Sequence, residues 1–312
     1  MKICFPSTNR VYLSRQQLLL KELKKHFQVD IIEYRSAYDN ILNVTADIAN
    51  HFRKVLGGNN YDLILIRGDR FEQLPIALLA SYKRLKIAHL EAGDISGAID
   101  NKVRHAITAL SDIHFATNKE SYARLIAMGT DPDWTFNFGS LDVEYAKEIS
   151  RIEGEIAKIN FTNLENLPQD YVLICHHALA GENPALIEKI VREEFKGNVI
   201  VIKSNKDNGA PYGKEEYSSE DYINLIAGAK CLVGNSSSFL KEASIFGTPV
   251  VNIGSRQQNR LKPHNVKDVP FEENQIRQML RFQLQTRYEP SDIYWQEGTS
   301  IKITEKIKEF LE

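Results

Sequence analysis

The sequence lacks three things: an apolar run long enough to cross a membrane, a cysteine framework and a strong net charge. Lys and Arg total 39 and Asp and Glu total 41, which leaves a formal net charge of -2. Such a balance offers no positive field to a nucleic-acid backbone. The first residues, MKICFPST, are typical of a strand and a loop instead of a leader. We expect a cytoplasmic protein with neither a membrane nor a nucleic-acid partner.

The three cysteines also exclude classes of protein by their positions. Cys4, Cys175 and Cys231 lie in separate apolar runs, and no CxxC motif joins any of them. The spacing of a disulfide framework or a zinc site is therefore missing, as is the HExxH helix of zinc enzymes. We expect buried thiols, no metal and no cofactor.

Short apolar runs alternate with amphipathic helical patterns along the whole chain. This alternation is typical of parallel sheets whose two faces are covered by helices. A chain of 312 residues exceeds what one core usually supports, so two domains are expected. The apolar runs form two series, one at 2–5, 29–34, 62–66, 86–90, 112–117 and 135–139, the other at 171–177, 198–205, 230–237 and 248–254.

Two such series predict an α/β protein with two Rossmann-like, doubly wound parallel-sheet domains. We place the N-terminal domain at residues 1–150 and the C-terminal domain at residues 151–290. A helix within 291–312 is expected to pack back on the first domain. Ligands of such sheets bind beyond the carboxyl ends of the strands. We therefore expect the active site in the cleft between the two domains.

The segment HLEAGDISGAIDNKVRH, residues 89–105, concentrates acids behind an apolar run. Asp100 and Arg104 lie one turn apart on a helix that we expect to begin near Asp100, and a salt-bridged helix start accounts for both. Glu91 and Asp94 lie on a loop with no evident need for charge. Acids grouped near a cation can have their pKa values moved apart, as a pair of proton-transfer groups requires.

At two other strand ends, the sequence allows either a structural or a functional role for the polar residues. Asp69 follows the run DLILIRG and is either a helix N-cap, with Glu72 completing a capping box, or a carboxylate of the site. His176 and His177 end the run YVLIC. A lone histidine at a strand end is usually a hydrogen-bonded structural group, whereas two in tandem favour a functional role.

The stretch GNSSSFLKE, residues 234–242, predicts an anion site. We expect a strand to end at Gly234 and a helix to begin among the serines, whose hydroxyls add donors to the N–H groups of a first helical turn. Glu242 is placed to accept hydrogen bonds from vicinal hydroxyls, as an acid does for ribose in dinucleotide folds. The alternative is a plain serine N-cap, but three serines exceed what a cap needs.

Three long stretches together resemble the UDP-N-acetylglucosamine 2-epimerase family, and most closely its hydrolysing branch, which serves sialic and related nonulosonic acid synthesis. They are GDRFE, HLEAGDISGAIDNKVRHAITALSDIHFATNKESYARLIAMG and GNSSSFLKEASIFGTPVVNIGSRQQNR. The resemblance runs from about residue 60 to 270. It implies a glycosyltransferase-B-like architecture, with a catalytic domain at residues 1–150 and a UDP-binding domain at residues 151–290. It also implies a UDP-sugar substrate and a homodimer.

The resemblance also implies a reaction and the residues that perform it. The reaction is proton abstraction at C2 of the sugar with anti elimination of UDP, followed by hydration of the 2-acetamidoglucal to free N-acetylmannosamine. The implied catalytic residues are Asp69, Glu91, Asp94, Asp100, Arg104 and His176. The implied residues for binding the UDP-sugar are Arg10, Asn205, Asn235, Ser236, Ser237, Ser238, Glu242 and Arg256.

The first loop, PSTNRVYLSR, departs from the tighter GTRxE-like turn that is usual in the family, and CHH stands where the hydrolysing branch commonly has His-Pro. Three alternatives therefore remain open: a non-hydrolysing UDP-sugar epimerase, a glycosyltransferase of the same build, and a UDP-sugar-binding protein without catalysis.

Overall fold

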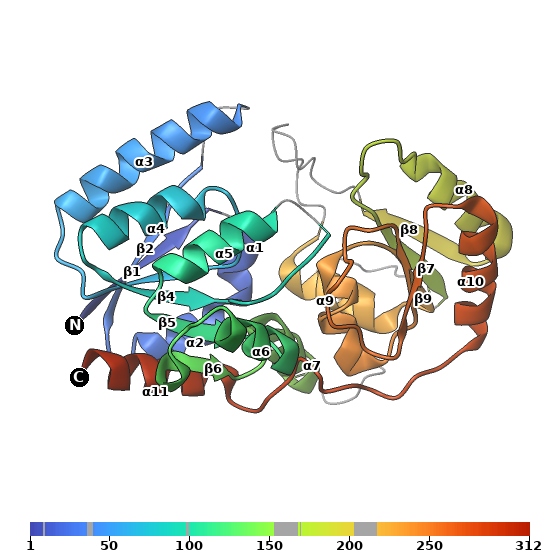
Figure 1. The fold of residues 1–312 in the computed structure, drawn as a ribbon. Coiled ribbons are helices and arrows are strands. Elements are labelled where there is room, and N and C mark those ends of the chain that lie inside the picture. The colour runs from blue at the N-terminus through green and yellow to red at the C-terminus, as the bar shows by residue number, and fades with distance from the viewer. Residues whose placement is uncertain (9, 36–39, 98–99, 153–167, 169, 203–216) are drawn as a thin grey trace. The chain divides into compact units, whose positions relative to one another are not determined.

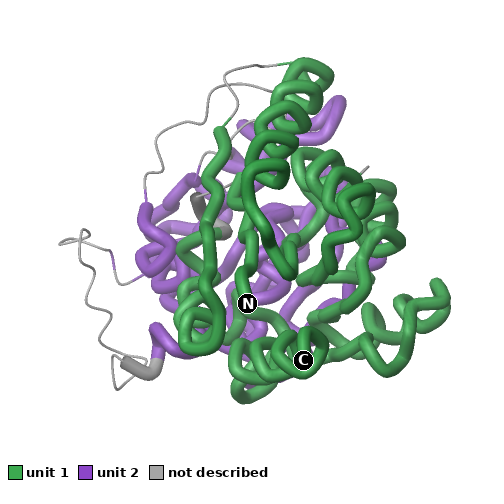
Figure 2. Tube along the Cα trace, turned by 90° about the vertical axis from the view of Figure 1, so that its left-hand side faces the viewer, with its two compact units in different colours: residues 1–144, 295–312 green, residues 145–294 purple. Residues whose placement is uncertain are grey.

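The structure, a computed structural model, describes every residue of the chain except 9, 36–39, 98–99, 153–167, 169 and 203–216. The chain divides into two compact units (Figures 1 and 2). Unit 1 comprises Met1–Glu144 and Trp295–Glu312, and unit 2 comprises Tyr145–Tyr294. The chain therefore leaves unit 1 within a single helix and returns to it for its last residues.

Unit 1 is built on a six-stranded sheet in the order β2-β1-β3-β4-β5-β6, with every neighbouring pair parallel. Its strands are β1 Lys2–Ser7, β2 Gln28–Glu33, β3 Leu63–Arg67, β4 Lys86–Leu90, β5 Ile113–Ala116 and β6 Thr135–Asn137. Its helices are α1 Arg10–Arg15, α2 Gln17–Leu23, α3 Ile41–Gly57, α4 Gln73–Tyr82, α5 Asp100–Leu110, α6 Lys119–Ala127, the start of α7 Leu141–Ile152, and α11 Thr299–Leu311.

Helices cover both faces of this sheet (Figure 1). On one face, Leu63 and Leu65 of β3 share a buried cluster with residues of α2 and α11. On the other face, Ile64 and Ile66 share a cluster with residues of α3, α4 and α5. Because successive strand residues point to opposite faces, a strand covered on both sides needs an unbroken apolar run. The LILI run of β3 meets that need.

The last helix completes unit 1. Ile303 and Ile307 of α11 are buried in the cluster that contains β1 and β3. At the start of α11, Thr299 Oγ1 donates to the carbonyl oxygen of Phe138 at 2.6 Å, and the Ser300 N–H donates to the Glu144 carboxylate at 3.0 Å. The acid therefore lies where the helix macrodipole is positive, which stabilises the helix start.

Unit 2 carries a five-stranded parallel sheet in the order β11-β10-β9-β7-β8. Its strands are β7 Tyr171–Cys175, β8 Asn198–Ile202, β9 Cys231–Gly234, β10 Val250–Ile253 and β11 Val266–Val269. Its helices are the rest of α7, α8 Pro184–Glu194, α9 Ser219–Gly228 and α10 Glu273–Gln285. Residues of α9 share a buried cluster with one face of the sheet, and residues of α8 and α10 share one with the other.

Both sheets have the same winding. Read from β8, the strands of unit 2 follow the chain order second, first, third, fourth, fifth, and unit 1 read from β2 begins in the same way. In doubly wound sheets of this order, ligands bind where the winding reverses, beyond the carboxyl ends of the first and third strands. These are β1 and β3 in unit 1 and β7 and β9 in unit 2. The predicted α/β class with two doubly wound parallel sheets is confirmed.

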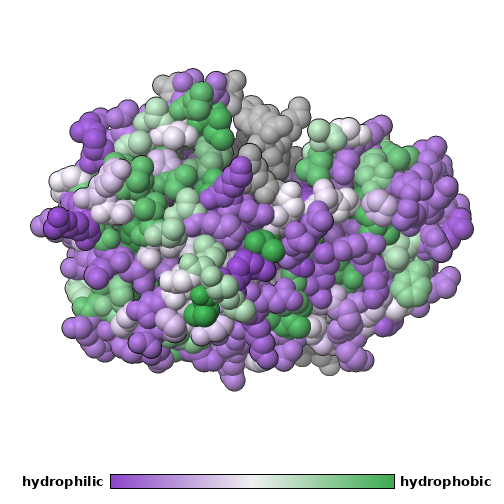
Figure 3. Space-filling model, viewed as in Figure 1, coloured by the Kyte–Doolittle hydropathy of each residue, from purple (hydrophilic) through white to green (hydrophobic). Residues whose placement is uncertain are grey.

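The surfaces of the two units differ over their helices. In the face shown in Figure 3, apolar side chains are interspersed with polar ones over α3 and α4, where Leu42 and Tyr82 are exposed. The region of α8 and α10 is more hydrophilic, and there Arg277 pairs with Glu193, Glu194 and Glu273 at 2.5–3.1 Å. Within the described ranges, no helix combines the length and apolar character that crossing a membrane requires.

The three cysteines are free and buried, as predicted. Burial raises the pKa of the Cys4 and Cys231 thiols to about 12, and it raises the pKa of Cys175 as well. Thiols with such pKa values are not nucleophiles at neutral pH. All three therefore act as small apolar side chains.

His89 connects the core of unit 1 to the loop that carries Asp69. The imidazole is fully buried on β4, with Nδ1 3.1 Å from Thr108 Oγ1 and Nε2 2.8 Å from the carbonyl oxygen of Gly68. Since a carbonyl oxygen only accepts, Nε2 carries the hydrogen of this bond. Burial lowers the pKa of His89 to about 4, so the ring is neutral at physiological pH.

We expect the free energy of unfolding to fall as the pH drops from about 6.5 to about 4, because His89 then takes up a proton only in the unfolded chain. The folded pKa lies below the unfolded one, so this stability is present above pH 6.5 and is lost below it. His89 accounts for a change on the order of 3 kcal/mol. Burial also lowers the pKa values of His105, His114 and His176, which act in the same direction.

Urea denaturation across this pH range, with His89→Gln as the comparison, measures the contribution of His89. The amide does not titrate and retains a donor for Gly68. The variant should therefore lose less stability on acidification than the wild-type protein does. Parallel losses in the two proteins would show that His89 is not responsible.

Candidate functional site

Polar side chains follow β3 and β4, which are neighbours in the sheet of unit 1. The register pairs Arg67 with Leu90, the last residues of the two strands. The loops that leave them carry Asp69 and Glu91, which were both predicted for the site. These carboxylates thus come from adjacent strand ends, at the edge of the sheet where ligands of doubly wound folds bind.

Glu91 is held in a strained backbone conformation beside a buried cation. Its φ of 61° lies in the left-handed region, which costs a non-glycine residue roughly 1 kcal/mol or more. Its Oε1 accepts a hydrogen bond from Arg67 Nη2 at 2.8 Å, and the same nitrogen donates to Asp142 Oδ1 at 2.6 Å. The Arg67 side chain is only 3% exposed. Strain kept at a polar, cation-paired residue is typical of functional sites.

Asp69 is not a helix cap. The helix that follows begins at Gln73, and Glu72 before it makes no capping hydrogen bond. The Glu72 carboxylate instead accepts from Arg70 Nη2 at 2.7 Å. The Asp69 carboxylate forms an ion pair with Arg104, which reaches it from α5. The capping-box interpretation is therefore wrong, since both acids are paired with arginines.

Arg104 ties three segments of unit 1 together. The predicted helix start is confirmed, since α5 begins at Asp100 and places the buried Arg104 one turn further on. Besides Asp69, its guanidinium donates to the carbonyl oxygen of Asp94 at 2.8 Å and to Asn101 Oδ1 at 3.1 Å. Arg104 thus fixes both the Asp69 carboxylate and the loop after β4.

Asp94 is buried, and one of its carboxylate oxygens is occupied by the start of α6. Oδ1 accepts from Ser121 Oγ at 2.6 Å, Thr117 Oγ1 at 2.9 Å and Asn118 Nδ2 at 3.4 Å. The acid is 4% exposed. These hydrogen bonds favour a role in anchoring the loop, and proton transfer by Asp94 stays a prediction.

In unit 2, the ends of β7 and β9 are joined through Asn235. Its Oδ1 accepts from the His177 N–H at 2.8 Å, and its Nδ2 donates to the His177 carbonyl oxygen at 2.9 Å. The backbone carbonyl of Asn235 accepts from Arg256 Nη1 at 2.9 Å. Gly234 has a φ of 139°, and a Cβ there would lie 2.0 Å from the Cys175 carbonyl oxygen. Only glycine permits this close approach of two backbones.

The serines after β9 do not begin an α-helix, and that prediction was wrong. They form a short 3₁₀ turn, η2 (Ser237–Phe239), followed by a second one, η3 (Glu242–Phe246). Gly247, with a φ of 65°, ends the second turn shortly before β10 begins. A 3₁₀ turn this short has little macrodipole. Anion binding would therefore depend on serine hydroxyls and backbone N–H groups.

The other residues predicted for the site are placed as follows. Ser236 Oγ lies 3.1 Å from the hydroxyl of Tyr222, and Ser238 and Glu242 are buried. Arg10 begins α1, but its side chain and the whole of Asn205 lie outside the described part of the structure. In the ranges that the structure describes, no group of three or more His, Cys, Asp or Glu side chains is arranged to hold a metal ion.

Two residues beside the site were missed by the sequence analysis. The sequence could have indicated Arg67, because it is a charged residue at the end of the fully buried strand LILIR. A buried strand accommodates a charge only if that charge is paired. Glu182 accepts a hydrogen bond from His176 Nε2 at 2.8 Å. It lies on a polar loop, where one more acid carries no sequence signal.

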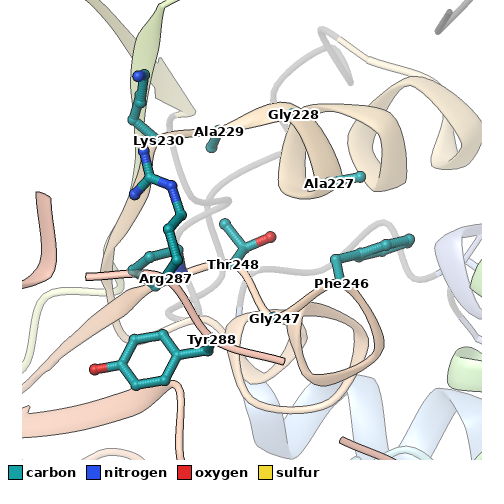
Figure 4. Close-up of a pocket in the computed structure, with 10 residues that line it drawn as sticks. Ala227, Gly228, Ala229, Lys230, Phe246, Gly247, Thr248, Arg287 and Tyr288 are labelled. Atoms are coloured by element: carbon teal, nitrogen blue, oxygen red, sulfur yellow. The ribbon is translucent and has the colours of Figure 1, made fainter. Parts of the chain in front are cut away.

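A cavity of about 260 Å³ lies in unit 2 before β9 and β10, at the amino ends of those strands (Figure 4). Among the described residues that line it, none was predicted for the site. Its lining includes Lys230, Phe246, Thr248, Arg287 and Tyr288. Doubly wound sheets bind their ligands at the carboxyl ends of the strands, so this cavity is not the candidate site.

Comparisons with known proteins agree with this architecture. The family model described as UDP-N-acetylglucosamine 2-epimerase matches residues 15–308. The chain is 29% identical to polysialic acid biosynthesis protein P7 of Escherichia coli, over 91% of this chain and 79% of that one. It is 28% identical to the GDP/UDP-N,N'-diacetylbacillosamine 2-epimerase (hydrolyzing) of Campylobacter jejuni, over 80% of this chain and 72% of that one.

A solved structure of S. aureus MnaA with UDP is similar with a TM-score of 0.81, at 18% identity, over 99% of this chain and 96% of that one. At that identity the likeness concerns the fold, and it confirms the predicted two-domain fold class.

We expect Gly234→Ala to destabilise the protein by more than about 2 kcal/mol, because the added methyl would collide with the Cys175 carbonyl. The matched control is Gly129→Ala, where φ is 85° and a Cβ would meet nothing within 4 Å. Thermal denaturation should show a much larger drop in Tm for the Gly234 variant than for the control. Equal drops in Tm would mean that glycine is required at position 234 because of backbone strain and not because of the contact between β7 and β9.

Proposed function

The chain belongs to the UDP-N-acetylglucosamine 2-epimerase family, and on that premise we propose that it is a hydrolysing member. Its substrates are UDP-N-acetylglucosamine, or a related UDP-2-acetamido sugar, and water. Its products are N-acetylmannosamine, or the related 2-epimeric sugar, and UDP. The proposal is supported by the similarity to the Campylobacter jejuni relative whose name includes the word hydrolyzing.

One observation carries the proposal: two carboxylates at neighbouring strand ends are each paired with a buried arginine. Glu91 is bound to Arg67, and Asp69 is bound to Arg104. The sugar proton at C2 is weakly acidic, so its removal needs a carboxylate held in fixed geometry. Addition of water to the resulting glucal needs a second proton-transfer group. Asp100, at the start of α5, is the third acid that we propose for these steps.

The departure of UDP places different demands on the protein. Negative charge grows on the diphosphate as the C1–O bond breaks, and preorganised donors stabilise that charge. We propose Ser236 and Ser237, with the N–H groups of η2, as these donors, and Glu242 as the acceptor for ribose hydroxyls. Arg256, which is fixed to the backbone of Asn235, adds a positive charge at the same strand end.

Family membership alone also allows the non-hydrolysing reaction, in which UDP stays attached to the epimerised sugar. A glycosyltransferase needs no such group of carboxylates, so the paired acids of unit 1 argue against it. The homodimer and the cytoplasmic location stay predictions.

The products separate these alternatives. We expect incubation with UDP-N-acetylglucosamine, followed by ¹H and ³¹P NMR, to show free N-acetylmannosamine and UDP in equal amounts. The diacetamido analogue of the substrate, assayed in parallel, tests which sugar is preferred. Accumulation of UDP-N-acetylmannosamine without free UDP would exclude hydrolysis, and no change in either substrate would exclude catalysis on both.

Asp100→Asn should lose turnover but keep UDP binding, whereas Glu242→Ala should bind UDP more weakly. The amide at position 100 cannot transfer a proton, so we expect turnover to fall by at least about 100-fold while UDP still binds. Loss of the acid at position 242 should weaken UDP binding, measured by calorimetry, by roughly tenfold. Normal turnover by Asp100→Asn would remove Asp100 from the mechanism, and an unchanged UDP affinity in Glu242→Ala would remove Glu242 from the binding site.

A further inference from the structure

His176, at the end of β7, is bound on one side by a carboxylate. Its Nε2 lies 2.8 Å from Glu182 Oε2, and the two side chains are only 1% and 11% exposed. The same carboxylate oxygen accepts a hydrogen bond from the Leu179 N–H at 2.9 Å. An ionised carboxylate only accepts hydrogen bonds, so the hydrogen between the two residues is on Nε2 of the imidazole.

The other ring nitrogen of His176 is buried and, among the residues that the structure describes, has no hydrogen-bond partner. Leaving a buried polar atom unpaired costs on the order of 1–3 kcal/mol. With the hydrogen held on Nε2, the unpaired Nδ1 has a free lone pair. It is therefore an acceptor that lacks a donor.

The surroundings hold both members of the pair in place. The ring of Phe271 packs against His176 with centroids 5.8 Å apart. Behind Glu182 lies Gly254, where φ is 77° and a Cβ would approach Glu182 Oε1 to 2.7 Å. A side chain at position 254 would displace the carboxylate. The chain thus has a glycine where Glu182 needs space.

We propose that Glu182 is a positioning residue, which fixes His176 in the tautomer with hydrogen on Nε2 and so presents Nδ1 as a hydrogen-bond acceptor to a hydroxyl or N–H group of the substrate. This inference rests on the proposed function for the identity of the substrate. It gives His176 a specific role, since an acceptor nitrogen contacts a donor group of the sugar or nucleotide and does not pair with the anionic phosphates.

The charges around His176 agree with a neutral ring. Burial lowers the pKa of His176, and His177 and Arg256 lower it further, whereas Glu182 raises it. The neutral imidazole therefore dominates at pH 7. Removal of the Glu182 charge should lower the pKa of His176 again, because among the described residues Glu182 is the anion that favours the imidazolium.

The experiment compares the full-length wild-type protein with Glu182→Gln, Glu182→Ala and, as a matched control, Glu188→Gln. Glu188 is an exposed acid of α8 that pairs with Arg192. Two-dimensional ¹H–¹⁵N NMR of the histidine rings, assigned with His176→Asn, reports the tautomer of His176 and its pKa. Turnover of the UDP-sugar is measured across the same pH range.

We expect wild type and Glu188→Gln to show the Nε2–H tautomer of His176. Glu182→Gln should keep that tautomer, since its amide oxygen still accepts, but with a lower His176 pKa. Glu182→Ala should show a tautomer mixture and a kcat reduced by at least about tenfold, with UDP affinity unchanged.

An unchanged tautomer in Glu182→Ala would overturn the proposal, and so would a tautomer shift with normal kcat. If Glu182→Ala does not fold, the pKa of His176 in Glu182→Gln is the deciding measurement. An unchanged pKa would contradict the proposal that Glu182 positions His176. If the wild-type protein turns over no UDP-sugar, the proposed function fails, and the tautomer measurements still decide whether Glu182 fixes His176.

Discussion

The positions of the acids at the carboxyl ends of β3 and β4 depend on the guanidinium of Arg67. A single nitrogen of this buried cation donates to both Glu91 and Asp142, so the loop after β4 and the first turn of α7 share one partner. Removal of one member of a buried ion pair typically costs about 3–5 kcal/mol, because the other charge is left uncompensated. Arg67 therefore makes it possible for two acids to lie close together at a buried strand end.

The same arrangement recurs on α5 with different residues. Arg104 is buried and binds the Asp69 carboxylate together with the backbone of the loop after β4. Both arginines reach the same edge of the sheet, one from the end of β3 and one from a helix. The carboxylates that they hold cannot move away without breaking an ion pair to a buried cation. Such preorganisation is what proton transfer at carbon requires.

The sequence predicted the sheets well because their strands are buried on both faces. Runs such as LILI and YVLIC are unbroken, and each became a strand of the structure. The exception is β11, whose sequence VKDV carries two charges at the edge of a sheet, so it has no apolar run. The predicted helix after Gly234 failed for another reason. Serines favour a helix start, but the segment before β10 forms two 3₁₀ turns, the second of which ends at Gly247.

The positions of the acids were predicted, but their partners were not. Capping rules are local, and they suggested that Asp69 belongs to the helix that follows it. Its actual partner, Arg104, comes from α5, beyond the next strand, and Arg67 likewise reaches Asp142 far along the chain. Pairs that are distant in sequence depend on the topology, which propensities do not encode. The sequence therefore indicated acids at neighbouring strand ends more readily than the arginines that hold them.

The position of α11 has a consequence for protein synthesis on the ribosome. Unit 2 is a continuous segment, whereas unit 1 takes α11 from the sequence that follows unit 2. Ile303 and Ile307 fill part of the core beneath β1 and β3, so that core stays incomplete until α11 has been synthesised. The second unit to be translated can therefore finish folding first, reversing the usual N-terminal-first order. A premature stop shortly before α11 would spare unit 2 and leave the core of unit 1 open to water.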